Sequence, residues 1–250
     1  MQRDYWYSVA RDPGDLDTAR LVGERAAQRT VRRLNARRVP TCQVPVLFAA
    51  EVAGSLIGHF VRAVTGSSQY RRASFLLNAA GSQVFPAFFR LHEQPHLPKG
   101  LGSAPFDNEG VGTRAQELVK DGVLERYVLG SYSARRLGLE TTANAGGVHN
   151  LFVEGNAQDP QRLMGSMERG LLVTELMGQG VNAVTGDYSR GAAGFWIENG
   201  EVQYPVEEIT VAGNLRDMYQ GLEATGTDID RRGNIVSGSI LIARMTVAGS

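Results

Sequence analysis

Residues 186–204 read GDYSRGAAGFWIENGEVQY, and this stretch carries the clearest fold signal in the chain. The Asn199-Gly200 dipeptide is typical of a type I′ turn, because both residue types tolerate a positive φ. A two-residue hairpin at this point predicts two cross-strand pairs on a common apolar face, Ile197 with Val202 and Phe195 with Tyr204. We therefore expect an antiparallel hairpin whose turn lies at residues 199–200.

Glycine recurs at short intervals in the first half of this hairpin and just before it, at Gly178 and Gly180. Such a density weakens strands unless another backbone or a ligand approaches closely. One interpretation is a groove in which an extended peptide adds to a sheet edge. The other is tight packing at a bend or a barrel corner. The sequence leaves both interpretations open.

The segments on either side predict helices and hairpins in irregular order. Apolar residues spaced by three and four predict helices over residues 16–34 and 52–64, and the basic residues of the first helix, among them Arg32 and Arg33, are expected on its solvated side. Further elements follow from local signals: strands at 5–10, at 44–48 and within 235–247, a hairpin turn at Asp121-Gly122 that pairs Val119 with Leu124, and helices capped by Asp159 and Asn214.

This order lacks the regular strand-helix alternation that a parallel sheet demands. We therefore predict an α+β fold, an antiparallel β-rich sheet or barrel-like domain with several packed helices.

Composition excludes several classes of protein. The 250 residues carry 26 Lys and Arg against 26 Asp and Glu, so the formal charge is zero and no field gathers nucleic acid or anionic lipid. The longest apolar stretches fall far short of the roughly 20 residues that span a bilayer. Cys42 is the only cysteine, which excludes cysteine-rich zinc sites and indicates a reducing compartment. We expect a cytoplasmic protein that binds neither nucleic acid nor membrane.

Residues 92–96, HEQPH, match the HExxH string of zinc peptidases. That motif works because a helix brings both imidazoles to one face around the metal. Pro95 disfavours helical geometry at the residue before it, so a helix running from His92 to His96 is not expected. We interpret the string as an extended surface loop, and the alternative is a metal site that needs this loop to rearrange.

Two other histidines stand in contexts that do not specify a role. His59 lies near the edge of the apolar stripe of the second helix, where a lone histidine is usually structural. His149 follows Gly146-Gly147, a pair that brings backbone amides to a ligand or simply makes a turn. No phosphate-binding loop, dinucleotide fingerprint or nucleophile elbow is present. The residues alone therefore do not demonstrate an enzyme.

Residues 178–215 resemble the C-terminal part of the TldD/PmbA peptidase family. Other pieces agree in the same order: residues 105–110 (PFDNEG), 131–138 (SYSARRLG), 145–150 (AGGVHN) and 174–180 (TELMGQG). The sequence is more similar to the TldE/PmbA branch than to the TldD branch. The resemblance implies that residues 1–250 form the family's C-terminal domain and that its N-terminal domain is absent from this chain.

The resemblance implies a cytoplasmic, two-subunit zinc peptidase in which only the TldD-type subunit carries the metal. The family's HExxxH motif follows a short apolar strand and would fall here on residues 50–55. Ala50 and Ser55 stand where the two histidines would be, Glu51 keeps the carboxylate, and Ser237 replaces a later cysteine ligand. Catalytic zinc needs three protein ligands and an open position. We therefore expect no catalytic or metal-binding residue in this chain and zinc in the TldD-like partner.

The implied role is a non-catalytic subunit that holds the TldD-like partner and limits access to extended or unfolded peptides, including leader peptides. Candidate contacts with peptide or partner are four residues: His149, Tyr188, Arg190 and Trp196. The two aromatic side chains are chosen as exposed, rigid groups of the kind that interfaces favour, although Trp196 also suits a core.

Two alternatives come from other classes of protein. One is a regulatory binding protein of the DNA gyrase modulator type. The zero net charge argues against direct contact of such a protein with DNA. The other is a metallopeptidase in its own right, using His92, Glu93 and His96.

Overall fold

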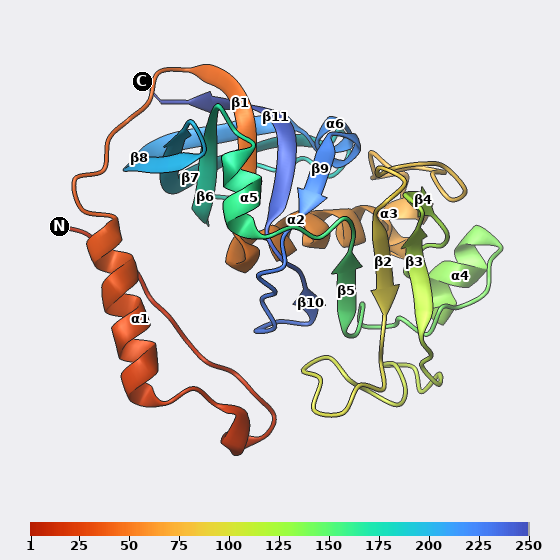
Figure 1. Ribbon diagram of the computed structural model, residues 1–250. Helices are drawn as coiled ribbons and strands as arrows, with labels where there is room; N and C mark the ends of the chain where they lie inside the picture. Colours follow the sequence, from red (N-terminus) through yellow and green to blue (C-terminus); the bar gives the residue numbers. More distant parts are fainter. Residues whose placement is uncertain (250) are drawn as a thin grey trace.

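The computed structural model describes residues 1–249 and is built around a closed β-barrel (Figure 1). Its sheet has the order β1-β6-β7-β8-β11-β9, and an additional β1–β11 pairing closes it into a barrel. One edge of β11 pairs with β1, and the other edge pairs with both β8 and β9. The strands are β1 (Cys42–Phe48), β6 (Arg169–Met177), β7 (Asp187–Glu198), β8 (Glu201–Asn214), β9 (Leu222–Thr225) and β11 (Ile240–Ala248). The β1–β6 pair is parallel and the other pairs are antiparallel.

The hairpin predicted at residues 199–200 joins β7 and β8. Asn199 and Gly200 have φ values of 51° and 78°, as the turn requires. Ile197 pairs with Val202 as predicted, but an irregularity between Trp196 and Ile197 shifts the register. The predicted pairing of Phe195 with Tyr204 is therefore wrong, because Phe195 faces Pro205 and Trp196 faces Tyr204.

Close packing accounts for the glycines of β7. A Cβ on Gly194 would lie 1.8 Å from the carbonyl oxygen of Leu172 on β6, which only a glycine avoids. From Gly191 to Glu198, β7 is paired with β6 on one side and β8 on the other. This part of the stretch has no free edge to which a peptide could add, so the packing interpretation is the correct one there.

A second, smaller sheet lies beside the barrel and has the order β10-β5-β2-β3-β4. Its strands are β2 (Arg90–Glu93), β3 (Gln116–Lys120), β4 (Val123–Leu124), β5 (Leu151–Glu154) and β10 (Ile235–Val236). The β3–β4 hairpin turns at Asp121 and Gly122, both at positive φ, and pairs Val119 with Leu124 as predicted. The chain thus forms an α+β fold with a mixed barrel and a second sheet.

The helices are α1 (Ala19–Arg32), α2 (Ala50–Ala63), α3 (Gly66–Tyr70), α4 (Ser131–Leu137), α5 (Pro160–Gly165) and α6 (Leu215–Gln220), with a 3₁₀ turn η1 at Pro13–Asp15. The predicted caps are confirmed: Asp159 accepts from Gln161 N and Asn214 from Arg216 N. No helix within residues 1–249 is long and apolar enough to cross a membrane.

Helix α2 joins the barrel to the second sheet (Figure 1). It follows β1 directly, packs on β6, and lies against β10 at Gly54. Its buried face contributes Leu56, Ile57 and Phe60 to the main core, where Phe60 meets the rings of Phe85 and Tyr219 edge to face. Burial of this apolar face fixes the position of the helix N-terminus relative to the barrel.

The strand predicted over residues 5–10 does not form. This segment has no ladder partner and runs along α1 instead (Figure 1). Tyr5 and Tyr7 are exposed and stack on each other, whereas Trp6 between them turns toward arginine side chains. The alternation seen in the sequence therefore reflects an extended segment held by side chains rather than by a sheet.

Candidate functional site

The N-terminus of α2 faces a cleft between the barrel and the N-terminal segment. Glu51 lies in the first turn of α2, where the helix dipole favours a carboxylate. The cleft has a volume of about 270 Å³, and its charged lining consists of three carboxylates and three guanidinium groups: Asp4, Glu51 and Glu175, with Arg29, Arg190 and Arg232. Its formal charge is thus balanced by the protein's own side chains.

Glu51 is engaged by an arginine of α1. Arg29 Nη1 lies 2.6 Å from Glu51 Oε1, and Arg29 Nε donates to Asp4 Oδ1 at 3.2 Å. The Arg29 and Glu51 side chains are 24% and 23% exposed, so water screens the pair only in part. Burial alone would lower the pKa of Arg29, but the hydrogen bond and charge of Glu51, with those of Asp4, raise it above its ordinary value. Arg29 is therefore a permanent cation beside Glu51.

A second arginine closes the cleft from the other side. Arg232 lies 3.8 Å from the centre of the Trp6 ring, and its Nη2 is 2.7 Å from Asp230 Oδ2. Arg25 and Arg29 also lie over Trp6, at 5.4 and 5.3 Å. Burial opposes the charge of Arg232, but Asp230 raises its pKa above the ordinary value, and Tyr7 and Glu51 act in the same direction. The N-terminal segment is held over the cleft by this cation–π cluster.

The three positions expected to replace zinc ligands lie in the same part of the molecule. Ala50 offers no ligand atom, and Ser55 Oγ donates to Val52 O at 2.7 Å within its own helix. Ser237 is buried just after β10, which packs on α2, and its hydroxyl donates to Gly238 O at 2.8 Å. The one remaining carboxylate, Glu51, already has a guanidinium partner. These residues do not fit a zinc ion, which needs three nitrogen, sulfur or carboxylate ligands.

Among residues 1–249, no group of three or more His, Cys, Asp and Glu side chains lies close enough together to hold a metal ion. This includes the HEQPH string, because His92 and Glu93 belong to β2 and not to a helix. The interpretation of this string as a surface loop is wrong: His92 and Glu93 are buried, and His92 stacks on Phe152. Its extended backbone agrees with the effect of Pro95.

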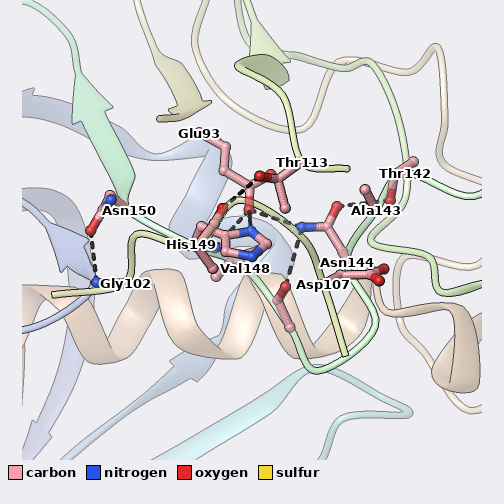
Figure 2. A network of polar contacts seen from close by, with 12 residues as sticks. Glu93, Gly102, Asp107, Thr113, Thr142, Ala143, Asn144, Val148, His149 and Asn150 are labelled. Atoms are coloured by element: carbon pink, nitrogen blue, oxygen red, sulfur yellow. Dashed lines mark hydrogen bonds and ion pairs between the residues drawn. The ribbon is translucent and has the colours of Figure 1, made fainter. Parts of the chain in front are cut away.

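Glu93 is the centre of a buried polar network (Figure 2). Its carboxylate is 0% exposed and accepts from Arg126 Nη2 at 2.9 Å, Asn144 Nδ2 at 2.8 Å and the His149 backbone N at 2.6 Å, with His149 Nδ1 at 3.0 Å. Because each buried charge needs partners, this set satisfies both oxygens. The network ties β2 to the 142–150 loop and is structural.

Asp107 holds the other side of the same loop. It accepts from the backbone N–H groups of Glu109 and Val111 on one oxygen and of Ala145 on the other. Burial alone would raise the pKa of Asp107, but these three donors and the charge of His149 bring it below its ordinary value. Asp107 therefore remains a carboxylate that anchors the loop.

The four candidate contact residues lie in different environments. Tyr188 and Trp196 are only 1% and 2% exposed, so the expectation of an exposed ring is wrong for Tyr188, and the core alternative is confirmed for Trp196. Trp196 donates to Glu198 Oε1 and Arg169 lies over its ring, and His149 belongs to the Glu93 network. Only Arg190 lines the cleft. Both rings point from β7 into the main apolar core.

Sequence reasoning missed the residues that fill the cleft. Arg29 lines the cleft although it belongs to the helix whose basic residues are expected in solvent. Arg33, outside the lining, pairs with the cleft residue Glu175 through its Oε2 at 2.6 Å and is largely covered. Trp6 and Arg232 lie far apart in the chain. The excess of arginine on α1 is the only local hint, and it does not specify the partners.

Comparison with known proteins identifies the family to which this fold belongs. A family model described as the PmbA/TldA metallopeptidase C-terminal domain matches residues 41–249. The chain belongs to this PmbA/TldD metallopeptidase family.

Curated relatives include "Metalloprotease PmbA" of Escherichia coli O157:H7, 52% identical over 249 residues, and "Metalloprotease PmbA homolog" of Haemophilus influenzae, 48% identical over 251 residues. Each alignment covers all of this chain but 55% and 56% of the relative, so the chain spans about half the length of these proteins.

Solved structures with the same fold include two named as candidate modulators of DNA gyrase. The one from Bacteroides thetaiotaomicron is 31% identical with a TM-score of 0.93, and covers 99% of this chain and 56% of that one. The one from Thermotoga maritima is 32% identical with a TM-score of 0.91, and covers 98% and 59%. TldE of Thermococcus kodakarensis, 24% identical with a TM-score of 0.82 and coverage of 96% and 57%, shares the fold.

Proposed function

We propose that this chain is the C-terminal domain, residues 1–250, of a non-catalytic subunit in a two-subunit zinc peptidase. The observation that carries the proposal is the Arg29–Glu51 ion pair. It occupies the start of α2, where the family's zinc motif would lie, and Ala50 and Ser55 stand at the two histidine positions. With alanine and serine at the ligand positions, these residues do not hold the metal whose bound water a carboxylate would activate, and Glu51 is paired with Arg29 instead.

In this proposal the zinc and the catalytic step belong to a TldD-like partner. This chain binds the partner and restricts the approach of substrate, so that extended or unfolded peptides and leader peptides are cleaved. The complex works in the cytoplasm, in line with the single cysteine. Arg190 in the cleft is the candidate contact that remains accessible.

The proposal is tested by reconstitution with a TldD-type subunit. We expect co-elution in gel filtration, cleavage of a leader peptide only when both chains are present, and zinc that elemental analysis assigns to the partner. Glu51→Gln in this chain should leave the cleavage rate unchanged in the assembled complex. Absence of co-elution, or loss of cleavage with Glu51→Gln in an intact complex, would contradict the non-catalytic role.

A second candidate is a regulatory protein that acts on DNA gyrase by binding. The names of the Bacteroides and Thermotoga structures favour it. The formal charge of zero argues against a mechanism that relies on direct DNA contact. Inhibition of purified gyrase by this chain alone, without a peptidase partner, would support this second function over the first.

A further inference from the structure

A small pocket next to the cleft carries positive charge with no carboxylate in its lining. It has a volume of about 50 Å³ and lies between α2 and the 178–183 segment. Its polar side chains are His59 and Arg62 from α2, Gln179 from the segment, and Arg190 from β7. Apolar walls complete it: Phe75, Val181, Ala183 and Leu215.

Neither arginine of this pocket has an acidic partner among residues 1–249. Arg190 Nε donates to Met177 O at 3.4 Å, and within the described residues neither Arg62 nor Arg190 forms an ion pair. The nearby carboxylates are engaged elsewhere, since Glu175 pairs with Arg33 and Asp187 accepts from Thr185 and Asn214. Two guanidinium groups that line the same pocket repel each other, and an anion that binds both would relieve this repulsion.

His59 supplies an unused buried polar atom at the same place. Its Nε2 is shielded from solvent and has no hydrogen-bond partner in the part of the chain that the structure describes. The ring packs against Tyr188, edge to face at a centroid distance of 6.0 Å. Burial lowers the pKa of His59, and the charges of Arg190 and Arg62 lower it further. An unpartnered buried nitrogen is costly, so a ligand that accepts a hydrogen bond from Nε2 would gain binding energy here.

The size of the pocket limits what that partner is. About 10–15 Å³ of cavity volume holds one water, so 50 Å³ has room for a group of about three non-hydrogen atoms. A carboxylate has that size, and it is the planar acceptor that guanidinium groups bind best. Arg190 lines both this pocket and the larger cleft, so the rest of a ligand has a direct way into the cleft.

We propose that His59, Arg62 and Arg190 form a binding pocket for a carboxylate, whose two oxygens accept from the guanidinium groups and from His59 Nε2. The same chemistry is offered by a small organic acid and by the C-terminal carboxylate of a peptide whose preceding residues lie in the cleft. The pocket is separate from the Arg29–Glu51 pair and does not depend on the proposed subunit role.

The test is an NMR titration that follows the signal of the His59 imidazole. This signal is identified because it is missing from the spectrum of His59→Gln. Acetate at constant ionic strength, balanced with chloride, should raise the pKa of His59, because a bound anion favours the imidazolium form. His92, His96 and His149 in the same spectra should not respond. No change at His59 up to saturating acetate would overturn the proposal.

Variants separate a built site from a general charge effect. Arg190→Gln and Arg62→Gln should each weaken the acetate response by roughly tenfold or more, since each removes a charge-assisted hydrogen bond, and Arg190→Lys should restore part of it. Arg71→Gln, an exposed arginine outside the pocket lining, is the matched control and should respond like the unmodified chain. Equal acetate responses in all these variants would also overturn the proposal.

Two further probes distinguish the sources of the carboxylate. N-acetyl-trialanine with a free C-terminus should bind more tightly than acetate if the ligand is a peptide end, and its C-terminal amide should not bind. A response to acetate with no gain from the peptide would assign the pocket to a small organic acid. Either result supports the carboxylate site.

Discussion

Glu51 and Glu93 each follow the first position of a zinc-peptidase-like string, and the two regions differ in almost every other respect. Glu93 belongs to the literal HExxH match, yet it lies in a strand, is fully buried and bonds to Arg126, Asn144 and His149. Glu51 belongs to a string without histidines, yet it lies at a helix N-terminus and faces a cleft. The environment of each carboxylate follows from its location in the fold and not from the letters of the motif.

The difference also has an energetic side. When a buried charge pair loses one partner, the other charge is left uncompensated, and the protein loses about 3–5 kcal/mol of stability. A partly exposed pair is screened by water and contributes about 1 kcal/mol or less. We therefore expect substitutions in the buried Glu93 network to cost more stability than substitutions at the Arg29–Glu51 pair.

The largest effect is expected at Glu93. Glu93→Gln removes the charge that compensates Arg126 and should lower the free energy of unfolding by about 3 kcal/mol. The measurement is urea denaturation followed by circular dichroism. Glu117→Gln, on the neighbouring β3 and paired with the exposed Arg90, is the control and should cost about 1 kcal/mol or less. Equal effects of the two variants would contradict the structural role of Glu93.

Asp107 tests the same region through pH. Asp107→Asn should cost about 1–2 kcal/mol near neutral pH, because the carboxylate accepts three backbone N–H groups. A pKa held below its ordinary value of 3.8 gives stability that is present above that value and is lost as pH falls through the folded pKa.

The difference between Asp107→Asn and the unmodified chain should therefore stay constant from neutral pH to about pH 5, and shrink only under more acidic conditions. Urea midpoints across this range measure it. A difference that already declines above pH 5 would show that the Asp107 carboxyl is not held in its charged form.

The third prediction addresses the cleft. Ala50→His, Ser55→His and Ser237→Cys together restore the expected ligand types, but Arg29 remains beside Glu51. Adding Arg29→Met should tighten zinc binding by roughly tenfold or more, about 1.4 kcal/mol, because a cation next to the site repels the metal.

Competition with a zinc chelator measures the zinc affinity of this engineered site with and without Arg29→Met. The matched control is Arg20→Met, an exposed residue of the same helix that pairs with Glu24. If Arg20→Met and Arg29→Met affect zinc binding alike, the Arg29–Glu51 pair does not oppose metal at this position.

The smallest effect is expected at Glu51. Glu51→Gln breaks an ion pair that water partly screens, so the free energy of unfolding should fall by about 1 kcal/mol or less. The same urea denaturation measures it. A cost as large as that of Glu93→Gln would remove the contrast between the two regions.

Much of the local structure could be predicted from the sequence. The Asn199-Gly200 turn, the caps at Asp159 and Asn214 and the apolar stripe of α2 depend on residues a few positions apart, and each is confirmed. Register was predicted less well, because the irregularity at Trp196 and Ile197 depends on packing between neighbouring strands.

The candidate site could be predicted only in part. The position of Ala50, Glu51 and Ser55 at the start of α2 follows from a strand and a helix adjacent in sequence. The partner of Glu51 is 22 residues away, and Glu93 finds His149 56 residues away. Nothing local specifies such pairs, because they form only when the barrel and the second sheet bring distant segments together.

The sequence by itself determined the hairpins, the helix starts and the loss of histidines at the cleft, since these depend on backbone preference and on side-chain chemistry at single positions. Tertiary structure alone decided that His92 and Glu93 are buried, that Trp6 and Arg232 meet over the cleft, and that His59 faces two arginines. The physical reason is that burial and charge pairing depend on which surfaces meet, and packing of the apolar core sets those contacts.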